Sequence, residues 1–443
     1  MNFDLPALPS GWEFKSLESC ARPGSISYGV VQPGAPVVKG VPIIRVNNFR
    51  DFRLDLSDVM RVAPEVEAKY SRTRLSGGEV LLTLVGSVGQ VAEVPHTCSG
   101  FNVARAVGVV KPANGIDSRW IAICLRSPLS QHLLSTRANT TVQTTINLKD
   151  VRALPIPIPP LAERSQIAEF ITALDDRIAL LRETNATLEA IAQALFKSWF
   201  IDFDPVRAKQ QGLAPVGMDE ATAALFPDSF EESALGLVPK GWRTVALSDA
   251  FEINPNRALK KGVIAAYLDM ASLATSGHCV EPPVQREFGS GTKFRNGDSL
   301  LARITPCLEN GKSAFVDFLA EDRIGWGSTE FIVLRPKTPL PEYFGYLLCR
   351  HPPFREHAIH SMSGTSGRQR VQNDVLGRYS LALPGEAIFS AFAEIVVPLQ
   401  AAIARNHSTS QTLAALRDTL LPRLISGQLR LPETMAEIDE AMA

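Results

Sequence analysis

Residues 163–200, ERSQIAEFITALDDRIALLRETNATLEAIAQALFKSWF, decide the fold of this 443-residue chain. Apolar side chains recur here in alternating steps of four and three, at Ile167, Ile171, Leu174, Ile178, Leu181, Leu188 and Leu195. Such stepping predicts a heptad seam along one long helix. Because neither proline nor glycine interrupts the stretch, the helix can run for about 57 Å at 1.5 Å per residue.

A second stretch, residues 392–424, has the same stepping and is expected to pair with the first. Its apolar seam positions are Val396, Leu399, Ile403, Leu413, Leu420 and Leu424. Aligning the two stretches at one fixed offset matches several identical residues, which favours an internal duplication over two unrelated core helices. Pro398 and Pro422 lie inside the second pattern and predict a kink or a late helix start.

Composition describes a globular protein, with 45 % hydrophobic and 21 % charged residues. The formal net charge of −1 gives no overall signature of a polyanion binder. Any contact with nucleic acid must therefore come from local basic patches or from a partner subunit. No run of eighteen apolar residues occurs, so we expect a cytoplasmic protein with no membrane span. The six cysteines have no Cys-x-x-Cys spacing, which favours free thiols over a zinc site.

Short β-type runs at 41–46, 79–85, 89–94 and 105–111, and a helix over 118–134, predict a mixed first domain. Its pattern restarts late in the chain, where Pro239, Gly241 and Trp242 repeat Pro9, Gly11 and Trp12.

We therefore predict an α+β fold: two related mixed α/β domains separated by a long antiparallel two-helix coiled coil, with an internal pseudo-two-fold repeat. The second helix must run back antiparallel if the two apolar stripes are to meet. The predicted parts are domain one (1–155), first helix region (156–203), linker (204–237), domain two (238–384), second helix region (385–430) and an acidic tail (431–443).

Four motifs carry a family resemblance: Pro-x-Gly-Trp at 9–12 and 239–242, Ile-Pro-Ile-Pro-Pro at 156–160, Phe-Lys-Ser-Trp-Phe at 196–200, and Leu-Leu-Pro-Arg-Leu-Ile-Ser-Gly-Gln-Leu at 420–429. With the duplication, they make the chain resemble the specificity subunits of type I restriction–modification systems over essentially its whole length.

The resemblance implies that each domain is a target-recognition domain for one half of a split, asymmetric sequence in double-stranded DNA. It also implies two modification subunits, docked on the helices, that bind S-adenosylmethionine and methylate adenine N6. The resemblance further implies that a restriction subunit that uses ATP and Mg can join them. This chain would then bind no cofactor or metal of its own, and it would not itself be an enzyme.

An active site within the chain is one alternative. His351-Pro352-Pro353-Phe354 looks like the Asp/Asn-Pro-Pro-Tyr/Phe loop of adenine methyltransferases, but histidine cannot supply the amide or carboxylate oxygen of that loop. His351, His357 and His360 lack an acidic or cysteine partner at metal-ligand spacing. The glycine-containing stretch 86–89 is interpreted as a turn between strands. A coiled-coil scaffold that binds no DNA is the other alternative.

Polar and basic side chains that can reach groove edges and phosphates are the candidate DNA contacts. In domain one they are Arg45, Asn47, Asn48, Arg72, Arg74, Arg137, Asn139, Thr141, Gln143 and Thr144. In domain two they are Lys293, Arg295, Arg303, Lys312, Arg368, Gln369, Arg370 and Gln372. A solvated surface residue is the alternative for each. The stretches that end at Asp150 and Asp374 are preferred because they lie at equivalent places in both copies.

Overall fold

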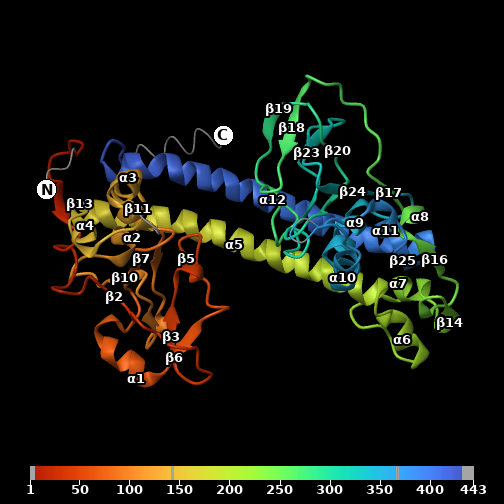
Figure 1. The fold of residues 1–443 in the computed structure, drawn as a ribbon, viewed down its shortest axis with the longest axis horizontal. Helices are drawn as coiled ribbons and strands as arrows, with labels where there is room; N and C mark the ends of the chain where they lie inside the picture. The colour runs from red at the N-terminus through yellow and green to blue at the C-terminus, as the bar shows by residue number, and fades with distance from the viewer. Residues whose placement is uncertain (1–4, 141–143, 366, 368, 432–443) are drawn as a thin grey trace. The chain divides into compact units, whose positions relative to one another are not determined.

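The computed structural model describes residues 5–140, 144–365, 367 and 369–431 (Figure 1). Helices and sheets are mixed throughout, as the sequence predicts. The chain divides into two compact units. Unit 1 comprises Met1–Ile178 with Thr412–Ala443, and unit 2 comprises Ala179–Gln411.

Unit 1 contains two main sheets. The four-stranded sheet has the order β2-β10-β7-β8, with bounds Ser27–Tyr28, Val107–Val110, Val80–Thr83 and Val91–Glu93. The three-stranded sheet has the order β6-β3-β9, with bounds Met60–Val62, Val41–Ile44 and Asn102–Val103. Three strand pairs complete the unit: β1 (Glu13–Ser16) with β13 (Pro155–Ile158), β4 (Phe49–Arg50) with β5 (Arg53–Leu54), and β11 (Asn139–Thr140) with β12 (Thr144–Thr145).

The four candidate strands of this domain are present as β3, β7, β8 and β10, each shorter than predicted. The short helices are α1 (Pro64–Glu67), η1 (Val46–Asn48), η2 (Ala68–Thr73), η3 (His96–Cys98), α2 (Ser118–Arg126), α3 (Pro128–Arg137) and α4 (Leu148–Arg152).

The single helix expected over 118–134 is wrong, because the chain forms α2 and α3 instead. Pro128 has no amide hydrogen to continue α2 and occupies the first turn of α3. The Ser127 hydroxyl caps α3 by accepting the Ser130 amide at 3.2 Å.

Unit 2 repeats this plan. Its sheet β17-β24-β21-β22 has the bounds Phe251–Ile253, Phe331–Pro336, Ser299–Ala302 and Ser313–Phe315. A second sheet, β19-β18-β23-β20, has the bounds Val284–Glu287, Ile264–Leu268, Gly325–Gly327 and Thr292–Phe294. β16 (Arg243–Ala246) pairs with β25 (Ser380–Leu383) as β1 pairs with β13. The short helices are α8 (Leu247–Ala250), α9 (Glu342–Arg350), α10 (Pro352–His360) and α11 (Asn373–Gly377).

The predicted linker 204–237 is folded. It contains α6 (Asp204–Gln210), α7 (Glu220–Leu225) and the hairpin of β14 (Phe230–Ser233) and β15 (Gly236–Pro239). Phe226 from this stretch packs edge-on against the Trp199 ring, with the ring centroids 5.1 Å apart. The predicted tail falls almost wholly in 432–443, outside the described residues.

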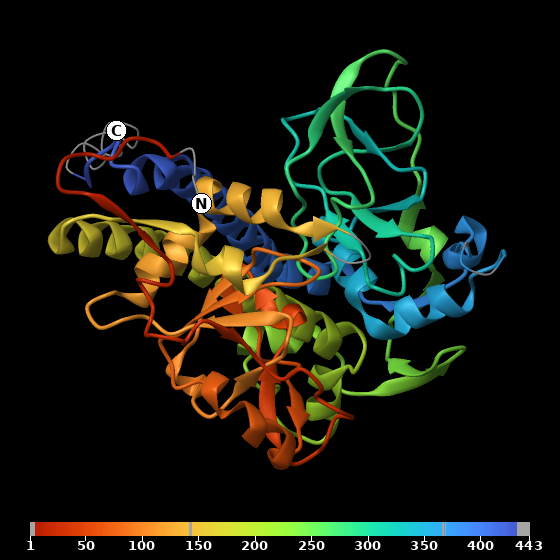
Figure 2. The same cartoon turned by 60° about the vertical axis from the view of Figure 1, so that its left-hand side comes forward.

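Two 40-residue helices, α5 (Leu161–Phe200) and α12 (Glu386–Ile425), each belong partly to unit 1 and partly to unit 2. In Figure 2, α5 is yellow to green and α12 is blue. Within unit 1, Ile171 near the start of α5 shares a core with Leu424 near the end of α12. Within unit 2, Trp199 near the end of α5 contacts Phe392 near the start of α12, with ring centroids 5.6 Å apart. Also within unit 2, Asn185 of α5 contacts Asn406 of α12, so residue numbers that rise along α5 meet falling numbers on α12, and the two helix segments of this unit run in opposite directions.

No predicted apolar seam position on either helix is exposed. Buried are Ile167, Ile171, Ile178, Leu181, Val396, Ile403, Leu420 and Leu424; half-buried are Leu174, Leu188, Leu195, Leu399 and Leu413. By length and composition alone α12 could cross a membrane, since its most apolar window has a mean hydropathy of 1.8 and is 28 % buried. A helix that packs an apolar stripe into protein cores gives the same signal.

The late start expected for the second helix is wrong, because α12 begins at Glu386, well before Pro398. Proline removes the hydrogen bond that its amide would donate to the carbonyl four residues earlier, here that of Glu394. Both Pro398 and Glu394 are exposed. The interruption therefore lies on the solvent side of the helix, where water can satisfy the carbonyl.

Two asparagines interrupt the apolar seam within unit 2. The Asn406 amide donates to Asn185 Oδ1 at 2.9 Å, and the Asn185 amide donates to the Ile403 carbonyl at 3.0 Å. A polar pair at seam positions fixes helix register at a cost in stability.

The replacement Asn406→Leu is expected to lower the free energy of unfolding by about 1 kcal/mol, because it leaves the half-buried Asn185 carbonyl without its partner. Asn185→Leu/Asn406→Leu is expected to restore or exceed native stability by burying two apolar side chains. Urea unfolding followed by circular dichroism measures both. A double variant no more stable than the single one would show that the two residues do not act as a pair.

Candidate nucleic-acid interface

In each unit a polar hairpin lies against the loop that follows an inner strand of the four-stranded sheet. In unit 1 this is the β11–β12 hairpin, where the Gly86 amide donates to the Thr144 carbonyl at 2.9 Å. In unit 2, Ser363 and Arg370 exchange backbone hydrogen bonds, and the Thr305 amide donates to the Gln369 carbonyl at 3.1 Å. The preferred polar stretches thus occupy equivalent positions.

The loop of unit 1 is the turn 86–89 between β7 and β8, as the sequence predicts. Gly86 and Gly89 both have positive φ, at 79° and 96°. A side chain at Gly89 would come within 2.6 Å of Gln131, whose amide donates to the Gly89 carbonyl at 2.9 Å. The Gln131 side chain of α3 therefore holds the backbone of this loop in place.

Four of the predicted residues of unit 2 come together beside its hairpin. The Arg303 guanidinium donates to the Val371 carbonyl at 2.5 Å and to Gln372 Oε1 at 3.4 Å. The Arg370 guanidinium binds both oxygens of Glu330, with its Nε 2.9 and 3.0 Å away. These hydrogen bonds lower the pKa of Glu330 below its ordinary value. Exposed Gln372 and half-buried Gln369 complete the group.

The predicted residues of the loop around Arg45 have different environments. Arg45 pairs with Asp58 at 3.3 Å, and Asn47 is exposed. Asn48 as a DNA contact is wrong, because its side chain is 2 % exposed and fully used. It accepts the Arg45 amide at 2.9 Å and donates to the carbonyls of Asp55 and Asp58 at 3.0 and 2.9 Å.

Arg74 holds a buried carboxylate. Its Nε lies 2.9 Å from Glu67 Oε1, which also accepts the Asn102 amide at 2.9 Å. The hydrogen bond from Arg74 lowers the pKa of Glu67, although burial of the carboxylate opposes this. Arg72, on η2, is exposed.

The remaining predicted residues have different positions, and among those described Asn139 lies in the unit 1 hairpin, where it pairs with Thr145 of β12. Lys293 donates to the Arg257 carbonyl at 2.9 Å, Lys312 donates to the Met270 carbonyl at 2.7 Å, and Arg295 is exposed. Arg137 is half-buried at the end of α3, and Asn139 begins β11. Thr141, Gln143 and Arg368 lie outside the described residues.

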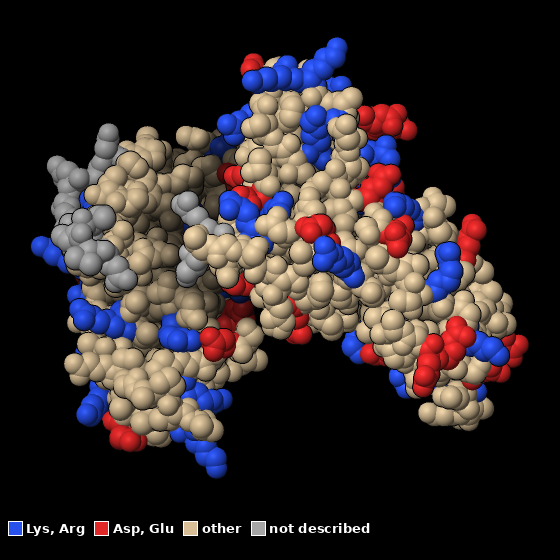
Figure 3. Space-filling view, turned by 45° about the vertical axis from the view of Figure 1, so that its right-hand side comes forward, with Lys and Arg blue, Asp and Glu red and all other residues tan. Residues whose placement is uncertain are grey.

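Sequence reasoning missed Arg286 on β19. Its guanidinium carbon lies 4.9 Å from the centre of the Tyr267 ring and 5.8 Å from that of Trp326, so an exposed cation rests on two aromatic rings. Figure 3 shows Lys and Arg side chains gathered at the end of unit 2 that carries β18 and β19. Lys260 and Lys261, which precede β18 in the chain, and Arg286 of β19 are exposed. The strand Val284–Glu287 is exposed at all four positions and does not alternate apolar with polar residues, so the sequence carries no period-two signal for it.

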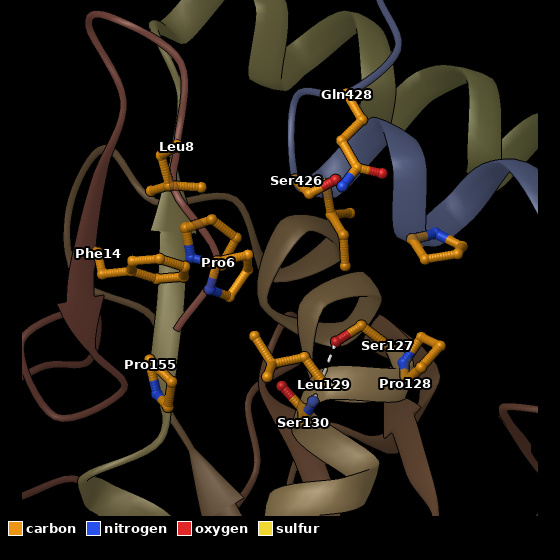
Figure 4. Close-up of a pocket in the computed structure, with 13 residues that line it drawn as sticks. Pro6, Leu8, Phe14, Ser127, Pro128, Leu129, Ser130, Pro155, Ser426 and Gln428 are labelled. Atoms are coloured by element: carbon orange, nitrogen blue, oxygen red, sulfur yellow. Dashed lines mark hydrogen bonds between the residues drawn. The ribbon is translucent and has the colours of Figure 1, made fainter. Parts of the chain in front are cut away.

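Two other features have no basic character. A pocket of unit 1 lies between the N-terminal segment, β13, α3 and the end of α12 (Figure 4). The described residues that line it carry no charge, and they include Pro6, Leu8, Phe14 and Leu129.

His351 precedes α10, and burial lowers the pKa of its imidazole. Among the residues that the structure describes, no group of three or more His, Cys, Asp or Glu could hold a metal ion.

Arg74→Met is expected to lower the free energy of unfolding at pH 7, because it leaves the Glu67 carboxylate buried without its ion-pair partner. Since Arg74 lowers the folded-state pKa of Glu67 from its ordinary 4.5, the difference from native protein should be full above pH 4.5. It should shrink as the pH falls and Glu67 becomes protonated. Urea unfolding at several pH values measures it, with exposed Arg72→Met as the control. Native stability with lost DNA binding would instead make Arg74 a DNA contact.

Comparison with known proteins adds family evidence to this geometry. Residues 36–190 match the family model for the type I restriction modification DNA specificity domain. The chain is 30 % identical over 422 residues to the type I restriction enzyme EcoKI specificity subunit of Escherichia coli (strain K12), covering 88 % of this chain and 86 % of that relative. It is 23 % identical over 457 residues to the MjaIX specificity subunit of Methanocaldococcus jannaschii, covering 97 % and 96 %.

The fold itself has a solved counterpart. The crystal structure of a type I restriction–modification S subunit from M. genitalium matches with a TM-score of 0.56 at 13 % identity, covering 96 % of this chain and 98 % of that one. Because a relative 30 % identical in sequence is matched over 88 % of this chain, the chain belongs to the family of type I restriction enzyme specificity subunits, the DNA specificity subunits of restriction–modification systems.

Proposed function

We propose that the chain reads a two-part DNA sequence, with one half-site bound by each unit, and that the paired helices set the spacing between the halves. The observation that carries the proposal is the repeated arrangement of a polar hairpin against a strand-end loop in two units that share α5 and α12. Two copies of one plan with different contact residues suit an asymmetric, bipartite target.

Hairpin residues and the loops beside them provide the proposed DNA contacts. In unit 1 these include Thr144 and the turn 86–89, and in unit 2 they include Arg303, Gln369, Arg370 and Gln372. Amide and hydroxyl groups can pair with base edges, and arginine can bind phosphates or guanine. Arg370 is already fixed by Glu330, so its guanidinium is oriented before DNA arrives.

Chemistry in this proposal belongs to partner subunits. Two modification subunits would supply S-adenosylmethionine and transfer its methyl group to adenine N6, and a restriction subunit would use ATP and Mg. The chain itself would contribute recognition and geometry, with no catalytic residue and no cofactor. The α5–α12 pair would form the antiparallel coiled coil that relates the two units by a pseudo-two-fold repeat and offers docking surface for these partners.

A coiled-coil scaffold without DNA binding is the weaker candidate, because the matched family is defined by DNA specificity. A gel shift on DNA carrying the methylated motif, with the modification subunits present, distinguishes the two. A scaffold would shift motif and scrambled DNA equally or not at all.

Lengthening the helices tests the spacing. Four residues inserted after Ile178 in α5, with four after Gln411 in α12, lengthen the pair by about 6 Å. The preferred spacer is expected to grow by about one or two base pairs, given roughly 3.4 Å per step, while both half-site sequences stay the same. Four residues interrupt the heptad register, so some loss of stability is expected.

Sequencing of methylated adenines in cells that carry the complete system measures the spacer. The control carries four residues in α5 only, which misaligns the two seams. An active, doubly extended protein with an unchanged spacer would show that the helices do not set the distance.

A further inference from the structure

The β4–β5 hairpin of unit 1 has an unusual turn. Asp51 and Phe52 have φ values of 45° and 65°, in the left-handed region that glycine and asparagine usually occupy in two-residue hairpin turns. A bulky aromatic residue is disfavoured in this conformation. Contacts outside the hairpin must therefore stabilise this conformation.

Those contacts are made to α2 and to both long helices. The Phe52 ring centre lies 3.7 Å from the Arg126 guanidinium carbon of α2 and 5.2 Å from that of Arg417 on α12. Both arginines bind Asp175 of α5, at 2.6 and 2.7 Å. The aromatic ring thus covers a nearly buried cluster of three charges at the junction of α2, α5 and α12.

The next hairpin residue adds an ion pair to the same helix. Arg53 Nη2 lies 2.6 Å from Asp176 Oδ1 on α5, and both side chains are at least half exposed. A cavity remains beside these contacts, lined by residues that include Glu93, Arg119 and Thr172. The hairpin therefore contacts the helices through the residues at its tip and does not fill the space beside these contacts.

Unit 2 fastens its domain to the helices differently. The Tyr346 hydroxyl donates to Glu189 of α5 at 2.7 Å, and the Gln400 amide of α12 donates to Asp317 at 2.6 Å. Asp317 also contacts the fully buried His278 at 3.2 Å. Tyr346, Glu189 and His278 are buried, whereas the tip of the unit 1 hairpin is exposed, with Phe52 at 42 %. Its attachment can therefore be altered without opening the core.

We propose that residues 51–53 form a positioning latch that holds the DNA-reading part of unit 1 in a fixed orientation on α5 and α12. The inference rests on the proposed function, because orientation matters only if unit 1 must meet its half-site at a set distance from the other. Phe52 and Arg53 are positioning residues in this account. They control how strictly the spacer is selected, and they do not control which bases are read.

The test measures methylation by the complete complex on DNAs that hold both half-sites at the native spacer or at one base pair more or less. Native protein is expected to prefer its own spacer strongly. Phe52→Ala/Arg53→Ala is expected to reduce that preference about ten-fold, which corresponds to about 1.4 kcal/mol of lost orientation energy. Preference for the half-site sequences should remain native.

Matched variants separate the latch from general destabilisation. Leu56→Ala removes another exposed apolar side chain of the same loop, 37 % exposed, and should leave the spacer preference unchanged. Phe52→Trp keeps an aromatic ring for the two arginines to contact, so its complex should keep the native spacer preference. Arg53→Asp should relax the spacer, and Arg53→Asp/Asp176→Arg should restore it by reversing the ion pair.

An unchanged spacer preference in the Phe52→Ala/Arg53→Ala complex would overturn the latch alone. Failure of the charge reversal to restore what Arg53→Asp loses would do the same, and this comparison stands even if the alanine variant does not fold. A native complex with no spacer preference at all would instead overturn the proposed function.

Discussion

The fold depends on two long helices that each need the other to cover an apolar stripe. Helix α5 cannot bury its seam against itself, and in each unit the cover comes from the opposite end of α12. Each unit therefore requires residues from distant parts of the chain. The beginning of α5 packs against the last turns of α12, and the end of α5 packs against the first turns of α12. The core of each unit therefore includes residues of both helices.

Polar groups within this pairing supply register, and the two units use different ones. Unit 1 has Asp175 between Arg126 and Arg417, and unit 2 has Asn185 with Asn406 and Glu189 with Tyr346. Unpaired charges or amides in a half-buried seam are costly, so each set favours its own partner alignment over shifted ones. The two units thus use different polar groups where their long helices contact each other and the domains.

Sequence periodicity could predict the two long helices, because heptad spacing is visible in one chain. It could not reveal the break at Ser127, where one proline and one cap decide against continuation, or the tolerance of Pro398, which depends on the exposed side of α12. Asn48 looked like a DNA contact because burial is not visible in sequence. The tip of the β4–β5 hairpin, with Phe52 in a left-handed conformation, had no signal at all.

The contact residues are where sequence says least, since exposed polar side chains follow no period. Mapping methylated adenines in cells with the complete system tests the central claim that the two units read independently. The account predicts that Thr144→Ala/Thr145→Ala alters only one half of the methylated motif and that Gln369→Ala/Gln372→Ala alters only the other. A change of both halves by either variant, or an unchanged motif with both, would contradict it.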